Sequence, residues 1–84
     1  MKKFVETDSS AWEELAGEIV TIFSLNYIYT GKLVGINDSC VMLENPSIVY
    51  ETGSFNTNEW ADAQKLPNEI YVQFNCIEAF GKVK

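Results

Sequence analysis

The sequence contains no histidine and no arginine, and it has only two cysteines, Cys40 and Cys76. Without histidine, catalysis by a histidine-containing dyad or triad is excluded. The two cysteines form no Cys-x-x-Cys pair, so the usual sequence pattern of a zinc site is also missing. We therefore expect Cys40 and Cys76 to be buried thiols in a reducing compartment, and we expect no metal and no other cofactor.

Long apolar runs are missing as well. No segment approaches the ~18 continuous apolar residues of a membrane-spanning helix, and the first residues contain no apolar run of signal-peptide length. No pair of carboxylates stands at a diagnostic spacing inside an apolar run, as an acid–base catalytic site would need. We expect a cytoplasmic protein that is not an enzyme and has no membrane partner.

The chain is short and acidic. Its 84 residues include six lysines and twelve acidic side chains, which gives a formal net charge of −6. We expect one domain over residues 1–84. A chain of this size buries only ~60–65% of its unfolded surface. With neither a disulfide nor a metal to add stability, oligomerisation is the expected source of it.

Acidic residues gather near the N-terminus, where five of the twelve fall within the first 18 residues. Nucleic-acid binders usually carry a basic patch, so this charge gives no long-range attraction to a phosphate backbone. An acidic surface of this kind either keeps the protein in solution or docks a basic protein partner on the helix face. The five residues are Glu6, Asp8, Glu13, Glu14 and Glu18.

Residue types that favour strands dominate the composition. There are seven isoleucines, seven valines, five threonines and eleven aromatic residues, against five alanines. Branched and planar side chains pack well on a pleated sheet, so the fold is expected to be mainly β. A short helix is expected at about residues 10–16. Ser10 and Glu13 have the spacing of a capping box, which starts a helix. Trp12 begins its apolar face, and Gly17 provides a stop.

Five strands are expected after the helix. The fourth has the clearest pattern, because Ile70, Val72 and Phe74 alternate with residues of the opposite face. Turn residues separate the first two strands at residues 25–27 and the next two at residues 37–39. The expected strands cover about residues 18–24, 28–37, 40–51, 69–74 and 77–82, and a long loop covers residues 52–67.

The second and third strands carry signs of bending. Gly31 and Gly35 weaken a flat strand but permit a sharp bend or a bulge. The expected core residues Leu33 and Ile36 break the period of two, which favours a bulge near Gly35. Pro46 cannot donate to a ladder and marks an edge or a bulge in the third strand. Strong bending is what a small closed barrel requires at its corners.

The loop over residues 52–67 is long for a compact domain, and such loops often carry function. Residues 59–66 have the composition for a helical turn, with Trp60 as its anchor. Phe55 and Trp60 present aromatic faces on which bases stack, and the alternative is that they pin the loop to the barrel. Tyr71 faces away from the core side of its strand, so it is expected at a subunit interface or on a stacking surface.

Residues 29–40 resemble the first signature of the Sm and Sm-like (LSm) proteins. In that signature an aromatic or aliphatic residue stands two positions before a glycine, a leucine two after it and an aspartate seven after it. Here these residues are Tyr29, Gly31, Leu33 and Asp38. The resemblance covers about residues 10–83. Residues 17–22 are similar to the family's helix end and first strand, and residues 75–80 are similar to its turn into the last strand.

The resemblance implies an N-terminal short helix followed by a five-stranded, strongly bent Sm-like (SH3-type) small barrel. It also implies a non-catalytic protein that forms a homo-oligomeric ring, because pairing the open edges of the fourth and fifth strands between copies hides them. Members of the family hold RNA near the central pore of such a ring. The implied ligand is RNA or another single-stranded nucleic acid, and the implied role is RNA processing or regulation.

The residues expected to bind nucleic acid lie in the turns after the second and fourth strands. Asp38 can accept hydrogen bonds from neighbouring backbone N–H groups and so hold the first turn. Polar side chains in these turns can contact bases or phosphates, although ordinary turn chemistry accounts for them equally well. The expected nucleic-acid-binding residues are Asn37, Asp38, Ser39, Cys40, Gln73 and Asn75, and the candidates for base stacking are Phe55, Trp60 and Tyr71.

Departures from the family pattern keep other functions open. Cys40 and Val41 stand where the family often has a stacking residue and an asparagine that reads the base. The arginine of the second signature, whose position falls near Gln73, is absent. The uridine pocket of the family is therefore not reproduced residue by residue. One alternative is a ring that has lost RNA binding and serves as a protein-interaction or structural module. Another is a monomeric SH3-like or OB-like barrel.

Overall fold

The computed structural model describes residues 11–84. Strands account for 54% of these residues, which confirms a mainly β fold with one short helix. A single turn of 3₁₀ helix, Phe74–Cys76, joins the last two strands. In chain order the elements are α1 (Ala11–Glu14), β1 (Ile19–Ser24), β2 (Ile28–Ile36), β3 (Cys40–Glu51), β4 (Asp62–Lys65), β5 (Ile70–Gln73) and β6 (Ile77–Gly81).

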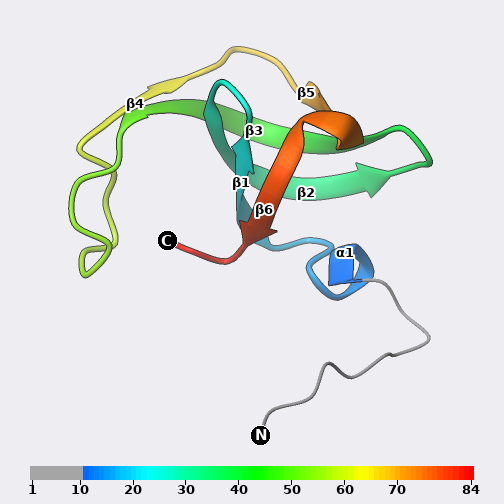
Figure 1. The fold of residues 1–84 in the computed structure, drawn as a ribbon, viewed down its shortest axis with the longest axis horizontal. Helices are drawn as coiled ribbons and strands as arrows, with labels where there is room; N and C mark the ends of the chain where they lie inside the picture. The colour runs from blue at the N-terminus through cyan, green and yellow to red at the C-terminus, as the bar shows by residue number, and fades with distance from the viewer. Residues whose placement is uncertain (1–10) are drawn as a thin grey trace, which may run out of the picture.

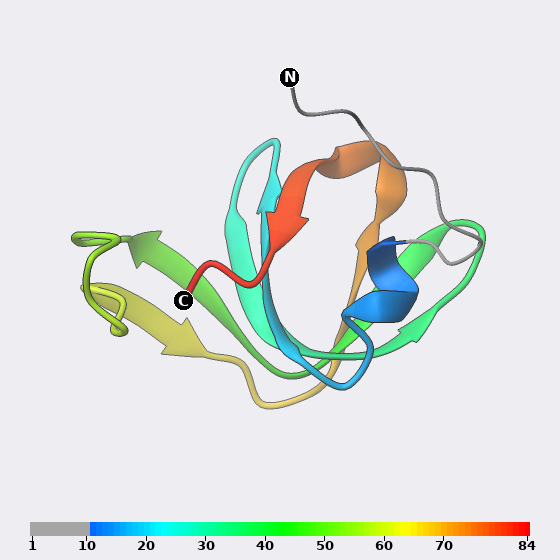
Figure 2. The same cartoon turned by 90° about the horizontal axis from the view of Figure 1, so that it is seen from below.

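All strand pairs are antiparallel, and the sheet order is β4-β3-β2-β1-β6, with β5 also paired to β3. The long β3 pairs with both β5 and β4, because its first residues pair with β5 and its last residues pair with β4. The sheet curls strongly, and α1 lies at one end of the curled part (Figures 1 and 2). β5 and β6 therefore end the curled sheet on its two sides and are joined directly by the 3₁₀ turn.

The bulge predicted near Gly35 is confirmed. The register between β2 and β3 shifts between Leu33 and Gly35, because Leu33 is opposite Leu43 but Gly35 is opposite Met42. A bulge of this kind increases the local bend of a strand. Ile36, predicted to lie in the core, is 44% exposed. The inward–outward alternation continues from the buried Leu33 through Gly35, so it leaves Ile36 on the outer face.

A second irregularity lies where Gly31 crosses β3. The register shifts again there, and on β3 the extra residues are Asn45, whose φ is 51°, and the buried Pro46. A Cβ at position 31 would meet the Glu44 carbonyl oxygen and the Pro46 Cα atom, both at 3.1 Å. Of the two positions predicted for Pro46, an edge or a bulge, the structure shows the bulge. The close approach of the two strands explains why position 31 is a glycine.

The core lies inside the curled sheet and draws on α1 and on four strands. Val72 of β5 is buried, and Ile70 and Phe74 are partly buried against the core, which confirms the predicted alternation of this strand. Tyr71 and Gln73 point outward. The buried cluster consists of Trp12, Val20, Ile22, Leu33, Val41, Leu43 and Val72.

Aromatic packing holds α1 against the sheet. Trp12 stacks on Phe80 with ring centroids 3.5 Å apart and meets Phe74 edge-on at 5.8 Å. The turn after α1 includes Gly17, which has a φ of 84°. Ser10, the first residue of the predicted capping box, lies outside the described residues. In the described part of the chain, no helix is long and apolar enough to cross a bilayer.

The long connection after β3 differs most from prediction. The helical turn predicted at residues 59–66 is wrong, because β4 (Asp62–Lys65) forms there and pairs with the last residues of β3. The sheet therefore has six strands rather than five. All four residues of β4 are exposed, so it has no amphipathic pattern that could mark it as a strand. Its conformation depends on the edge that the far half of β3 offers.

Candidate nucleic-acid interface

Two turns that are far apart in the sequence meet at one end of β5. Cys40, the first residue of β3, is opposite Gln73, the last residue of β5. The Phe74 N–H donates to the Ser39 carbonyl oxygen at 3.0 Å and extends this pairing into the turns. The β2–β3 turn and the Phe74–Cys76 turn are thus neighbours.

Asn37 organises the β2–β3 turn. Its Oδ1 atom accepts hydrogen bonds from the backbone N–H groups of Ser39 at 2.8 Å and Cys40 at 3.0 Å. The Ser39 hydroxyl donates to the same oxygen at 3.2 Å. The sequence predicted this role for Asp38, but the structure assigns it to Asn37, whose side chain reaches the residue two positions ahead as turn asparagines do.

An open depression with a volume of about 440 Å³ lies between the two turns, and we call it the turn depression. Five of the six predicted binding residues line it, and among the lining side chains that the structure describes only Asp38 is charged. The sixth, Asn37, is engaged in holding the turn. Phe74 was missed as a lining residue because its pattern placed it in the core. The lining residues are Asp38, Ser39, Cys40, Tyr71, Gln73, Phe74 and Asn75.

Tyr71 is the one predicted stacking residue that lies at the turn depression. Its side chain is 65% exposed, so a face of the ring is open to a ligand. Phe55 and Trp60 lie instead in the connection between β3 and β4, where their rings meet edge to face with centroids 6.4 Å apart. The structure therefore divides the predicted stacking residues between two places.

Three side chains near the turns limit what the site can do. Val41 is fully buried, so its side chain cannot reach a ligand in the turn depression. Cys40 and Cys76 are free thiols, and both are half-buried rather than buried as predicted. Their sulfur atoms lie near asparagine side chains, with Cys40 Sγ 3.6 Å from Asn37 Oδ1 and Cys76 Sγ 3.5 Å from Asn75 Oδ1.

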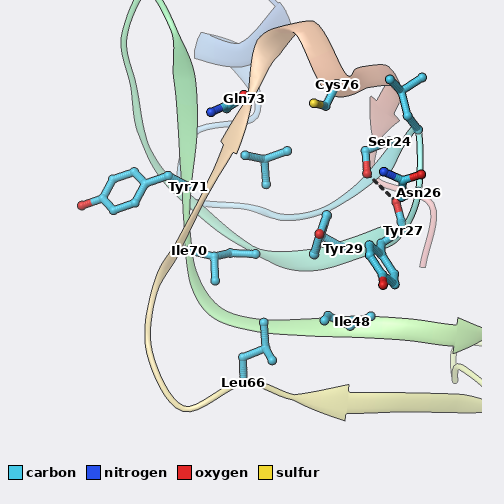
Figure 3. A pocket seen from close by; sticks show the side chains of 12 residues that line it. Ser24, Asn26, Tyr27, Tyr29, Ile48, Leu66, Ile70, Tyr71, Gln73 and Cys76 are labelled. Atoms are coloured by element: carbon cyan, nitrogen blue, oxygen red, sulfur yellow. Dashed lines mark hydrogen bonds between the residues drawn. The ribbon is translucent and has the colours of Figure 1, made fainter.

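A second depression, of about 470 Å³, lies between β5 and the β1–β2 turn, and we call it the edge depression. Figure 3 shows Ile48, Leu66 and Ile70 around it and Tyr71 pointing away from it. Burial raises the pKa of Tyr29 inside it, and the nearby Tyr27 and Cys76 raise this pKa further. The sequence predicted unpaired edges on the strands beside this opening, but it did not predict a depression there.

The free side of β5 presents backbone groups. In an antiparallel pair, the backbone groups of every second residue point to the same neighbouring strand. The Phe74 N–H bonds to Ser39 next to β3, so the N–H and C=O groups of Val72, two residues earlier, also point toward β3. Tyr71 therefore directs its N–H and C=O groups to the opposite side, and Gln73 directs its N–H group there, while the Gln73 C=O serves the 3₁₀ turn that follows. That side has no strand partner within residues 11–84.

The free side of β6 can be located in the same way. The Ser24 N–H donates to the Tyr27 carbonyl oxygen at 3.1 Å, so Thr21, three residues earlier on β1, bonds toward β6 instead. Its partner on β6 is Gly81. Phe80, the residue before Gly81, therefore directs its N–H and C=O groups away from β1, to a side that is unpaired in the described residues.

Comparison with known proteins adds no family to this description. No protein-family model matches the sequence, and no curated protein matches it either. Among residues 11–84, no three side chains of the metal-binding types gather as a metal site would require. Function is therefore inferred from the two depressions, the free strand edges and the charges around them.

Proposed function

We propose that the chain is a subunit of an Sm-like homo-oligomeric ring that binds single-stranded nucleic acid, RNA in the first place, at the turn depression. The observation that carries the proposal is the meeting of the β2–β3 and Phe74–Cys76 turns beside the free edge of β5. A non-catalytic role in RNA processing or regulation follows from this reading.

The finer fold that we propose is a five-stranded Sm-like barrel of the SH3 type, made of β1, β2, β3, β5 and β6. The two bulges between β2 and β3 support it, because they supply the bends that a small barrel needs at its corners. In this view β4 is an extension paired to the far half of β3 and stands outside the barrel.

Ring assembly is supported by the chemistry of the two free edges. An unpaired edge is a template for another strand, and pairing β5 of one copy with β6 of the next satisfies both edges. The partner strand would also cover the edge depression, whose lining is largely apolar. Leu25 (64% exposed) and Tyr27 (50% exposed) border this depression and would lose water contact on assembly, which adds stability to a small domain.

The lining of the turn depression suits bases better than phosphates. The Ser39 hydroxyl and the amides of Gln73 and Asn75 can pair with base edges, and the Tyr71 ring can stack on a base face. None of the lysines within residues 11–84 lines the depression. Base contacts without phosphate neutralisation predict an affinity that changes little with salt, because the salt dependence follows the number of neutralised phosphates.

Fluorescence anisotropy with short U-rich and A-rich oligonucleotides tests this ligand. We expect binding at low salt with a shallow salt dependence. Replacing Tyr71 by alanine should weaken binding by about 5- to 150-fold, because loss of one stacked base costs roughly 1–3 kcal/mol. Tyr50→Ala is the matched control, since Tyr50 is an exposed tyrosine of β3 that does not line the depression. Absence of binding at high protein concentration would show that the proposed nucleic-acid function is wrong.

A ring that serves as a protein-interaction or structural module is the second candidate. The negative charge of Asp38 in the turn depression, the burial of Val41 and the exposed Glu14 and Glu18 favour a basic partner over nucleic acid. Binding of a lysine-rich peptide, weakened by Glu14→Lys, would support this candidate when the oligonucleotides do not bind. If the peptide also fails to bind, the second candidate is rejected.

A further inference from the structure

A cage of carbonyl oxygens and aromatic rings surrounds the ammonium group of Lys84. The Nζ atom of Lys84 lies 4.7 Å from the ring centroid of Trp60 and 5.3 Å from that of Phe55. A primary ammonium has three N–H donors, and here each has one carbonyl acceptor. Lys84 Nζ donates to the backbone oxygens of Thr52 at 2.6 Å, Ser54 at 2.9 Å and Glu59 at 2.7 Å.

The frame of the cage is built by the loop between β3 and β4. Thr57 donates its N–H to the Ser54 carbonyl oxygen at 3.3 Å, and the Thr57 hydroxyl lies 2.9 Å from that oxygen and 3.2 Å from the Glu59 carbonyl oxygen. Gly53 has a φ of 68°, and a Cβ there would stand 3.2 Å from the Ala61 Cβ. The carbonyl groups therefore converge through contacts that do not involve Lys84.

Lys84 itself reaches the cage from the other end of the chain. It follows β6, and Figures 1 and 2 show this end of the chain beside the β3–β4 connection. The nearby Lys82 is engaged elsewhere, in an ion pair with Glu18 at 3.1 Å. The site formed by residues 52–60 is thus occupied by the side chain of Lys84, which is distant in the sequence.

We propose that residues 52–60 form a binding site selective for a primary alkylammonium group, with Lys84 as its resident ligand. Three converging carbonyl oxygens match three N–H donors on one small nitrogen, whereas a guanidinium is planar and spreads its donors. A quaternary ammonium can use the rings of Phe55 and Trp60 but has no proton for the carbonyl oxygens. The ligand class is therefore a lysine side chain or another primary amine, which enters when Lys84 is displaced.

This proposal is independent of the ring and of the turn depression. The cage shares no lining residue with the turn depression, and it lies on the connection that the proposed barrel leaves outside. Loss of oligonucleotide binding would leave the cage unaffected, and loss of the cage would leave the free edges of β5 and β6 in place.

The test uses Lys84→Met, which removes the ammonium from the full chain, with Lys82→Met as a control of equal charge. The Thr57 amide exchange rate and the Trp60 indole resonance are followed by NMR. We expect about tenfold faster exchange and a shifted indole in Lys84→Met, because charge-assisted hydrogen bonds and a cation–π contact are lost. Both signals should stay unchanged in Lys82→Met. Lys84→Arg should behave like Lys84→Met, because the guanidinium does not fit.

The second arm adds n-butylammonium, which mimics the lysine side chain, to Lys84→Met. The Trp60 resonance should return toward its wild-type position and saturate, and tetramethylammonium at the same concentration should not restore it. Identical spectra for Lys84→Met and the wild type would show that the cage is not occupied by Lys84. Equal effects of n-butylammonium and tetramethylammonium on the Trp60 resonance, or no restoration by n-butylammonium, would overturn the proposed selectivity.

Discussion

At the scale of single residues, the candidate site depends on the amide of Asn37. One oxygen of this side chain accepts from two backbone N–H groups of the turn that carries Ser39 and Cys40. Asn37→Ala leaves both donors without this partner, so we expect a loss of about 1–2 kcal/mol in the free energy of unfolding. Urea denaturation measures this change.

Asp38→Ala is the matched control for Asn37→Ala. The Asp38 carboxylate makes no hydrogen bond with the residues that the structure describes, so its removal should change stability by less than about 0.5 kcal/mol. If Asp38→Ala proves the more damaging of the two substitutions, the turn is held as the sequence pattern first indicated and not by Asn37.

Gly31 is the residue at which two strands approach most closely. A Cβ there would meet backbone atoms of Glu44 and Pro46 at 3.1 Å, and neither atom can move aside as a flexible side chain could. Gly31→Ala should therefore destabilise the fold by about 1–3 kcal/mol. Gly35→Ala, whose nearest neighbour would be the Met42 Cβ at 3.4 Å, should have a much smaller effect in the same thermal or urea unfolding experiment.

Residue-scale features were predictable where a residue type has one physical use. Pro46 cannot donate to a ladder, and this alone limited its position to a sheet edge or a bulge. The choice between Asn37 and Asp38 was not predictable, because both side chains can accept from a turn's N–H groups. Only the backbone geometry decides which oxygen reaches them.

At the scale of elements, α1 depends on one side chain. Trp12 is 9% exposed and packs between Phe74 and Phe80. Trp12→Ala should lower the free energy of unfolding by about 3–5 kcal/mol, which leaves such a small domain close to its unfolding midpoint. Glu14→Ala on the same helix is exposed and should have little effect. A loss below about 1 kcal/mol for Trp12→Ala would mean that α1 does not dock as described.

The free edge of β5 can be blocked without disturbing its ladder to β3. Gln73 directs its N–H away from β3, and its φ of −73° is close to the value that proline requires. Gln73→Pro should therefore keep the fold, as measured by circular dichroism, while it removes an edge donor and weakens assembly. Light scattering should show a shift toward the monomer mass.

Gln73→Ala separates edge pairing from side-chain effects. It removes the same amide side chain but keeps the backbone N–H, so the oligomer should persist. An assembly that survives Gln73→Pro at unchanged mass would show that this edge of β5 takes no part in it.

The elements show where sequence patterns suffice. The alternation of Ile70 and Val72 located β5, because one of its faces is buried. β4 could not be found, since Asp62–Lys65 are all exposed and form a strand only because β3 is long enough to pair with them. A strand formed by pairing alone has no hydrophobic period to detect.

At the scale of the whole molecule, charge and assembly act against each other. Each copy carries a net charge of −6, so bringing copies together adds repulsion that salt would screen. If a ring forms, the free energy gained by pairing the free edges and covering the edge depression must exceed the free energy of this repulsion. The site was partly predictable at this scale, because the resemblance brought the two turns together. The Lys84 cage was not, since nothing in the sequence links residues 52–60 to Lys84.

The mass of the protein in solution tests the central claim most directly. Light scattering at micromolar concentration and physiological salt should give a defined multiple of the 9.5 kDa chain mass, as edge pairing into a closed ring requires. A stable 9.5 kDa monomer under these conditions would contradict ring assembly and leave a monomeric small barrel as the account of the fold.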